Sequence, residues 1–250
     1  MIALRAPAKL TWFLEVVSRR DDGYHELRSE MTTIDFHDVL VVDEDGDYVR
    51  VNNPFDSAVP GDEHNLVARA LALVGRRAGV TIEKTIPVGG GLGGGSADAA
   101  AILRWAGGVS AERALTLGGD VPFCQLGGRA LVEGVGERLS ALPFETRDVT
   151  LIMPSFGVAT AQCYAAFDEL RASGWVPDGS NHLEVPAGVV EPRLKTTLAW
   201  LRAEFSPEVQ LAGSGTTLFV PGHLEGNRHV WDATGPEGAL QFCQTTTSLS

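Results

Sequence analysis

A run of glycines that opens directly into an alanine-rich segment is the feature that most limits how this chain can fold. Six of the seven residues from Gly89 to Gly95 are glycine, and Ser96 is followed by the stretch 97–106, which is rich in alanine. Ordering so many glycines costs conformational entropy, so they are typical of places where the backbone approaches a ligand closely. Because Ser96 is a good N-cap and alanine has the highest helix propensity, we predict a loop that ends at a helix N-terminus.

Such a loop favours a phosphate ligand. Successive glycine amides and the free N–H groups at the start of a helix can converge on one anion without any basic side chain. The chain has a formal net charge of −12, which argues against binding to nucleic acid or to an anionic membrane, so a phosphate has to be held by local donors. A flexible turn or tight packing of the helix on a strand is the alternative interpretation.

Two familiar phosphate loops fit this sequence less well. The Walker pattern requires a lysine after its last glycine, but Gly95 is followed by Ser96. The glycines do satisfy the dinucleotide pattern G-x-G-x-x-G, yet Pro87 interrupts the strand that should precede it. The acidic residue that this pattern needs about 20 residues further on would be Glu112, which falls in a predicted short helix. A nicotinamide-dependent enzyme is therefore the weaker alternative.

Composition and local patterns predict an α+β fold of one large domain or two packed modules. The chain has 250 residues, of which 44% are hydrophobic and 21% charged, enough to bury a core without disulfides or metals. Strands and helices are mixed along it, and an Asp-Gly turn at 44–47 predicts a hairpin between its two flanking strands. Expected strands are 10–17, 39–43, 48–51, 80–86, 129–132 and 149–153, and 211–220 is expected to be a glycine turn that enters a strand. Expected helices are 65–75, 97–106, 110–117, 160–170 and 194–205, and 120–123 is expected to be a tight connection.

The cysteines and the absence of a long apolar run indicate a cytoplasmic protein. Cys124, Cys163 and Cys243 are widely spaced and have no ligand-like spacing to histidine, which is typical of reduced thiols. No run of about 18 apolar residues occurs, so no membrane-spanning or export segment is predicted. The polar segment 140–147 contains Pro143 and marks a soft boundary between two parts of the chain.

Three motifs, in the right order, resemble the GHMP kinase superfamily. They are Pro7-Ala8-Lys9, the glycine loop 89–96 and Ala212-Gly213-Ser214-Gly215. The resemblance implies a two-lobed α+β kinase fold with an N-terminal ATP-binding domain over 1–147 and a smaller C-terminal substrate domain over 148–250. Residues 20–27, 86–100 and 117–123 further resemble the branch that phosphorylates the 2-hydroxyl of a cytidine diphosphate-linked methylerythritol, a small molecule of non-mevalonate isoprenoid synthesis.

The resemblance also implies the catalytic residues and the cofactors. Asp120 matches the superfamily's catalytic aspartate and Lys9 its partner lysine. A carboxylate can orient an alcohol and accept its proton late in phosphoryl transfer, while an ammonium offsets the negative charge on the attacking oxygen. The alternatives are an aspartate that caps a turn and a lysine on a solvated edge. ATP and Mg²⁺ are expected, with the ion held mainly by nucleotide and water.

Further site residues follow from the same resemblance. Ser96 would contact a phosphate oxygen or Mg²⁺, although N-capping alone would explain it. Tyr164 would cover one face of cytosine, although a core tyrosine explains it as well, and Thr11 stands where the superfamily usually has asparagine. The expected ATP-binding residues are Pro87, Gly89, Gly90, Gly91, Leu92, Gly93, Gly94, Gly95 and Ser96; the expected substrate-binding residues are Thr11, Tyr24, His25, Tyr164, Gly213 and Ser214.

Two alternatives remain within this superfamily. One is a kinase that acts on a different small alcohol, and the other is a shortened member that binds nucleotide without catalysis. The presence of both Lys9 and Asp120 argues against the second. The sequence predicts no particular oligomeric state.

Overall fold

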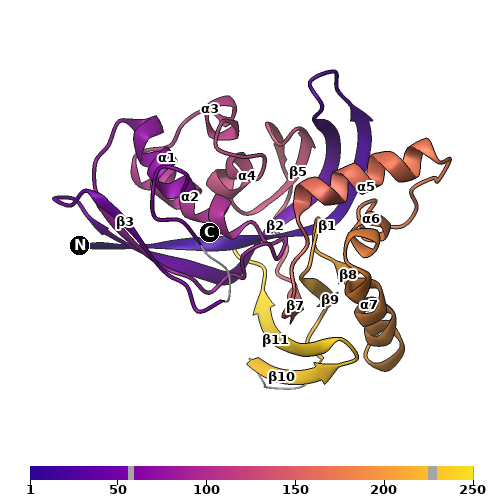
Figure 1. The fold of residues 1–250 in the computed structure, drawn as a ribbon. Helices are drawn as coiled ribbons and strands as arrows, with labels where there is room; N and C mark the ends of the chain where they lie inside the picture. The colour runs from indigo at the N-terminus through magenta and orange to yellow at the C-terminus, as the bar shows by residue number, and fades with distance from the viewer. Residues whose placement is uncertain (56–58, 225–229, 250) are drawn as a thin grey trace.

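Two β-sheets with helices packed beside them make up the molecule (Figure 1). The structure, a computed structural model, describes residues 1–55, 59–224 and 230–249. The first sheet and helices α1 to α4 come from residues 2–141, and the second sheet and helices α5 to α7 from residues 148–246. This arrangement confirms the expected α+β class, while the domain limits at 147 and 148 stay a prediction.

The first sheet is built around a long antiparallel hairpin of β1 (Ile2–Arg19) and β2 (His25–Asp43). The pairing runs from Ile2 opposite Val42 to Arg19 opposite His25, with three register shifts along the way. β1 is longer than the strand expected over 10–17. Because it extends past the first sheet, its far end reaches the second part of the molecule, where Leu14 is buried in the second core.

The prediction of a hairpin around the Asp-Gly turn is wrong. β3 (Tyr48–Asn52) follows that turn but pairs in parallel with β4 (Gly79–Glu83), and β4 pairs in turn with β2. The physical reason is that the turn at Gly46 lies against Gly79, where a Cβ on Gly46 would be 2.7 Å from the Gly79 Cα atom. β4 therefore occupies the position beside β2 that a hairpin partner would take, giving the order β3-β4-β2-β5-β6 with β5 (Arg129–Gly134) and β6 (Arg138–Ala141).

Helices α1 to α4 lie together on one side of the first sheet (Figure 1). Helix α2 (Gly94–Trp105) has Gly93 as its N-cap, so Ser96 lies in the first turn and is not the cap expected from the sequence. The connection expected over 120–123 is instead Asp120 and the start of helix α4 (Val121–Leu126), because Pro122 is accommodated in a first helical turn. The other helices agree with the sequence: α1 (Leu66–Val74), capped by Asn65, and α3 (Ala111–Leu115), capped by Ser110.

The second sheet has the order β10-β11-β7-β9-β8 within the described residues. The strand and helices expected in this part are confirmed as β7 (Asp148–Pro154), α5 (Thr160–Ala172) and α7 (Pro192–Glu204). The remaining elements are α6 (Glu184–Val190), β8 (Gln210–Leu211), β9 (Leu218–Pro221), β10 (Val230–Gly235) and β11 (Gly238–Thr246). After β11 the chain returns to the first sheet, where Thr247 bridges to Ile34.

Three clusters of buried apolar side chains hold these parts together. One lies between the first sheet and helices α1, α2 and α4, and a second joins the second sheet to helices α5 to α7. The third contains Leu10, Leu92 and Phe219, from β1, the glycine loop and β9. Because this third cluster draws on both parts, the glycine loop is fixed at their junction. None of the helices in the described residues is long and apolar enough to cross a membrane.

Candidate functional site

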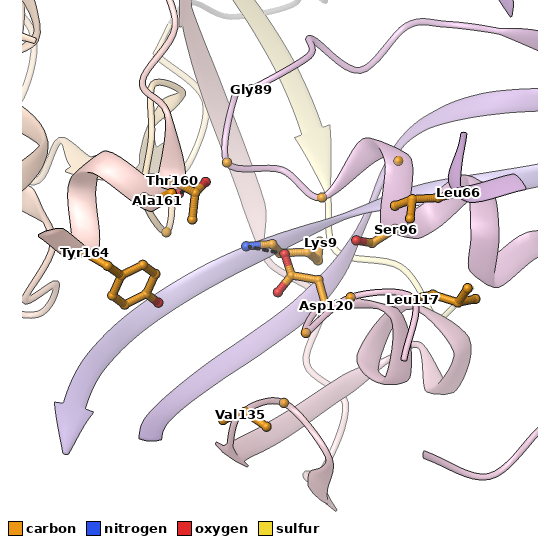
Figure 2. A pocket seen from close by; sticks show the side chains of 18 of the residues that line it. Lys9, Leu66, Gly89, Ser96, Leu117, Asp120, Val135, Thr160, Ala161 and Tyr164 are labelled. Carbon is orange, nitrogen blue, oxygen red and sulfur yellow. Dashed lines mark hydrogen bonds and ion pairs between the residues drawn. The ribbon is translucent and has the colours of Figure 1, made fainter. Parts of the chain in front are cut away.

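A cleft of about 1410 Å³ lies where the two parts meet. Strand β1, the glycine loop, the residue before α4, helix α5 and the third glycine motif all contribute to its walls (Figure 2). The sequence-predicted site residues that line it are Lys9, Tyr24, His25, Pro87, Gly89, Gly90, Gly91, Gly93, Gly94, Gly95, Ser96, Asp120, Tyr164, Gly213 and Ser214. The structure therefore brings nearly the whole predicted set to one place.

Lys9 and Asp120 form an ion pair in this cleft. The Lys9 Nζ atom is 3.4 Å from Asp120 Oδ2, the lysine side chain is 6% exposed and the aspartate side chain 33% exposed. Lys9 also donates a hydrogen bond of 3.1 Å to the Thr11 hydroxyl. A buried ammonium beside a partly exposed carboxylate leaves one face of the carboxylate open to a ligand. Thr11, expected to bind substrate, is itself buried and supports Lys9.

The glycine loop packs closely on its neighbours at Gly91, where there is no room for a side chain, and at Gly93, where a side chain would be tightly packed. A Cβ on Gly91 would lie 2.2 Å from the Ala212 carbonyl oxygen, and one on Gly93 would lie 3.0 Å from Lys9 Cγ. Both residues also have positive φ, +79° and +69°, a region that favours glycine. The loop is glycine-rich here because its backbone touches the third glycine motif on one side and Lys9 on the other.

Leu92 differs from its glycine neighbours because its side chain points away from the cleft into the core between the two sheets. Its carbonyl oxygen accepts a hydrogen bond of 3.0 Å from the Lys9 backbone N–H. Leu92, expected among the ATP-binding residues, thus anchors the loop and holds it against β1.

The loop runs into helix α2, whose N-terminus faces the cleft. Gly93 offers no side chain to cap the first amides, so they remain available to an anion, with the positive end of the helix dipole behind them. Ser96 lies in this first turn, and Figure 2 shows its side chain directed to the same space as Lys9 and Asp120. Backbone amides and one hydroxyl therefore surround the position that a phosphate would take.

The third glycine motif closes the cleft beside Lys9. A Cβ on Gly213 would be 3.2 Å from Lys9 Nζ, a tight contact, and its φ of +61° favours glycine at this position. Ser214 Oγ is 2.9 Å from Thr160 Oγ1 at the start of α5. The buried Asn181 side chain donates to the carbonyl oxygens of Leu211 and Gly213, at 2.9 and 2.7 Å, and thereby fixes the motif.

At the other end of the cleft, His25 and Tyr164 are stacked on each other. Their ring centroids are 4.8 Å apart and their planes differ by 21°. His25 Nε2 is 2.8 Å from Asp168 Oδ1, and Arg19 is 3.3 Å from the other oxygen of Asp168. Burial raises the pKa of the Tyr164 phenol, so its hydroxyl stays protonated. Tyr24 is 66% exposed at the rim, and thus free to pack on a ligand.

Several residues of this site have weak sequence signals or none. Asp168 follows Tyr164 by four residues on α5, so helical spacing places the two side chains on one face of the helix. This spacing from a predicted site residue could have identified Asp168 from the sequence. Asn181 carries no local pattern that separates it from an ordinary loop asparagine.

Among the described residues, the one grouping of three metal-ligating side chains is Asp62, Glu63 and His64, all of them exposed.

Comparisons with known proteins agree with this geometry. The GHMP kinases N terminal domain matches residues 65–128. The chain is 36% identical over 231 residues to the 4-diphosphocytidyl-2-C-methyl-D-erythritol kinase of Paracoccus denitrificans, covering 86% of this chain and 84% of the relative. It is 37% identical over 246 residues to the enzyme of the same name from Polynucleobacter necessarius, covering 88% and 82%.

Solved structures show the same fold. A crystal structure of 4-(cytidine 5'-diphospho)-2C-methyl-D-erythritol kinase superposes with a TM-score of 0.70 at 31% identity, covering 99% of this chain and 100% of that one. A mevalonate kinase structure superposes with a TM-score of 0.55 at 13% identity, covering 89% and 92%, a likeness of fold alone.

Proposed function

The chain belongs to the family of 4-diphosphocytidyl-2-C-methyl-D-erythritol kinases within the GHMP kinases, and we propose that it transfers the γ-phosphoryl group of ATP to the 2-hydroxyl of 4-diphosphocytidyl-2-C-methyl-D-erythritol. The observation that carries this proposal is the placement of the Lys9–Asp120 ion pair between the start of α2 and the third glycine motif. Nucleotide phosphate and alcohol would meet at that pair.

The reaction needs positioning and charge stabilisation more than covalent chemistry. The substrate hydroxyl would donate to the open face of Asp120, which orients its oxygen toward the γ-phosphorus. As the new O–P bond forms, the bond from the γ-phosphorus to the β–γ bridging oxygen breaks, ADP leaves, and Asp120 accepts the hydroxyl proton. Lys9, at 3.4 Å from Asp120, orients that carboxylate and offsets the negative charge that develops on the attacking oxygen.

The triphosphate would be held by main-chain donors. The amides of the glycine loop and of the first turn of α2 face the cleft, and the helix dipole favours an anion there. Ser96 is the described residue whose hydroxyl fits a phosphate oxygen or Mg²⁺ at this position, with nucleotide and water as the remaining ligands. When bound, Mg²⁺ would neutralise charge on the β- and γ-phosphates.

The cytidine end of the substrate would lie against His25 and Tyr164. Aromatic faces stack on bases, and the exposed Tyr24 at the rim supplies a second plane. Gly213 and Ser214 would approach the substrate diphosphate.

We also propose that residues 1–147 act as the nucleotide domain and residues 148–250 as the substrate domain. We further propose that the protein is cytoplasmic, since its three buried cysteines are free.

A coupled assay for ADP formation across candidate alcohols tests the proposal. Suitable alcohols are 4-diphosphocytidyl-2-C-methyl-D-erythritol, homoserine and mevalonate, the latter two being substrates of kinases with the same fold. We expect ADP to form with the cytidine-linked alcohol and not above background with the others. Turnover with homoserine or mevalonate instead would assign the chain to another GHMP activity, and binding of nucleotide without turnover would indicate a non-catalytic member.

A further inference from the structure

A buried ionic cluster of Asp38, Lys84 and Asp98 lies at the two ends of the glycine loop, where Lys84 and Asp98 border the cleft, and it has no role in the mechanism described above. The side chains of these residues are 0%, 4% and 5% exposed. They come from three elements: Asp38 from β2, Lys84 from the residue after β4, and Asp98 from helix α2. Charged groups are rarely buried this far unless they are paired, since removing them from water is costly.

Asp38 fixes the segment that enters the glycine loop. Its Oδ1 atom accepts hydrogen bonds from the backbone N–H groups of Thr85 and Ile86, at 2.5 and 2.8 Å. Its Oδ2 atom accepts from Lys84 Nζ. A single carboxylate on β2 thus holds the chain just before Pro87, where the loop begins.

Lys84 connects this anchor to the other end of the loop. Its Nζ atom donates to Asp98 Oδ2 at 2.9 Å, in helix α2. A Cβ on Gly94, the first residue of α2, would be 3.1 Å from Lys84 Nζ. The ammonium therefore sits directly beneath the first turn of the helix whose amides face the cleft.

From this connectivity we propose that Asp38, Lys84 and Asp98 act as positioning residues, holding both ends of the glycine loop so that its amides and those of the α2 N-terminus converge on the nucleotide phosphates. The cluster touches the loop's two ends and leaves its middle to Lys9 and the third glycine motif. The proposal rests on the proposed function in one respect, which is that the loop binds ATP.

A matched pair of variants on β2 separates positioning from general stability. Asp38→Asn weakens the anchor of the loop, whereas Glu30→Gln weakens a different ion pair of the same strand, with Arg129 at 2.8 Å. The affinity for a non-hydrolysable ATP analogue is measured by calorimetry, and amide hydrogen exchange is followed over residues 85–96. We expect Asp38→Asn to weaken binding at least about tenfold and to speed exchange in the loop, while Glu30→Gln changes neither.

If Asp38→Asn does not fold, a variant that lacks all three charges of the cluster tests the proposal instead. Asp38→Asn/Lys84→Met/Asp98→Asn removes all three charges together, and replacing a complete buried ionic cluster is often tolerated. We expect it to fold, with a melting temperature near that of the parent, and still to bind the analogue about tenfold more weakly. Parental affinity in this variant would overturn the proposal, as would unchanged affinity and exchange in a folded Asp38→Asn.

The parent protein distinguishes the two proposals. If it binds the analogue and the neutral variant binds equally well, the cluster is only structural and the kinase assignment stands. If the parent does not bind the analogue at all, the proposed function fails first.

Discussion

Lys9 Nζ lies 3.4 Å from Asp120 Oδ2, although the two residues are 111 positions apart in the sequence. Lys9 is carried by the middle of β1 and Asp120 by the residue before α4. The alkyl chain of Lys9 lies beside Gly93 and its ammonium beside Gly213, so one lysine side chain lies between the glycine loop, the third glycine motif and the carboxylate. The arrangement gives Asp120 a fixed orientation and one open face.

Removing the charge of Asp120 should affect turnover much more than binding. For Asp120→Asn we expect kcat to fall by about 10²–10⁴-fold, the usual contribution of a proton acceptor, with the affinity for an ATP analogue within about threefold of the parent, because main-chain donors hold the phosphates. Steady-state kinetics and calorimetry provide the two values. Asp232→Asn on the exposed face of β10 is the control. Parental kcat in Asp120→Asn would remove this residue from the mechanism.

Two glycines of the loop with similar backbone angles should tolerate alanine very differently. Gly89 has φ of +72° with open space around its Cβ position, while Gly91 has φ of +79° and a carbonyl oxygen at 2.2 Å. Gly89→Ala should cost about 1–2 kcal/mol for the left-handed conformation. Gly91→Ala should cost about 1–3 kcal/mol more for overpacking and weaken binding of the ATP analogue. Equal melting temperatures for the two variants would contradict this packing.

The contribution of Asp98 to the stability of the protein should fall as the pH rises from about 4 to 7. Burial, opposed in part by Lys84, raises the pKa of this carboxyl from 3.8 to about 7 in the folded state. The folded state thus binds more protons than the unfolded state across that window, so ionisation destabilises it with increasing pH. The free energy of unfolding of Asp98→Asn, taken relative to that of the parent, should therefore be higher at pH 8 than at pH 4. Denaturant unfolding at the two pH values measures this gain, and a constant difference would contradict the pKa shift.

The Asp168 carboxylate should matter for the alcohol substrate and not for ATP. It holds His25 Nε2 at 2.8 Å and thereby the ring that stacks on Tyr164. In Asp168→Asn we expect the KM for the cytidine-linked alcohol to rise about tenfold, as for the loss of a charge-assisted hydrogen bond, with the KM for ATP unchanged. Glu169→Gln, exposed on the same helix, is the matched control. A rise in both KM values would indicate a general structural effect.

Local sequence signals predicted the elements that carry the phosphate site, and failed where pairing depends on distant chain. The glycine loop and its helix were predictable because glycine, serine and alanine act through backbone propensity. The pairing of β3 was not predictable. An Asp-Gly turn indicates that the chain reverses locally, but it does not indicate that β4, about 30 residues later, lies between β2 and β3.

Ser96 and the site residues likewise show which features local sequence predicts and which depend on contacts across the fold. Ser96 was identified as a site residue, but the cap itself is Gly93, because the left-handed backbone there suits a glycine. Asn181 and Lys84 reach their partners across the fold, and single residues of these types are common in any sequence. Only their three-dimensional neighbours distinguish them.

The most direct test is the position of the γ-phosphate in a crystal of the protein with a non-hydrolysable ATP analogue and 4-diphosphocytidyl-2-C-methyl-D-erythritol. We predict that the γ-phosphate accepts hydrogen bonds from amides at the start of α2, and that the substrate 2-hydroxyl lies about 3 Å from Asp120, in line with the γ-phosphorus. A nucleotide bound away from the glycine loop, or a 2-hydroxyl out of reach of Asp120, would contradict the account.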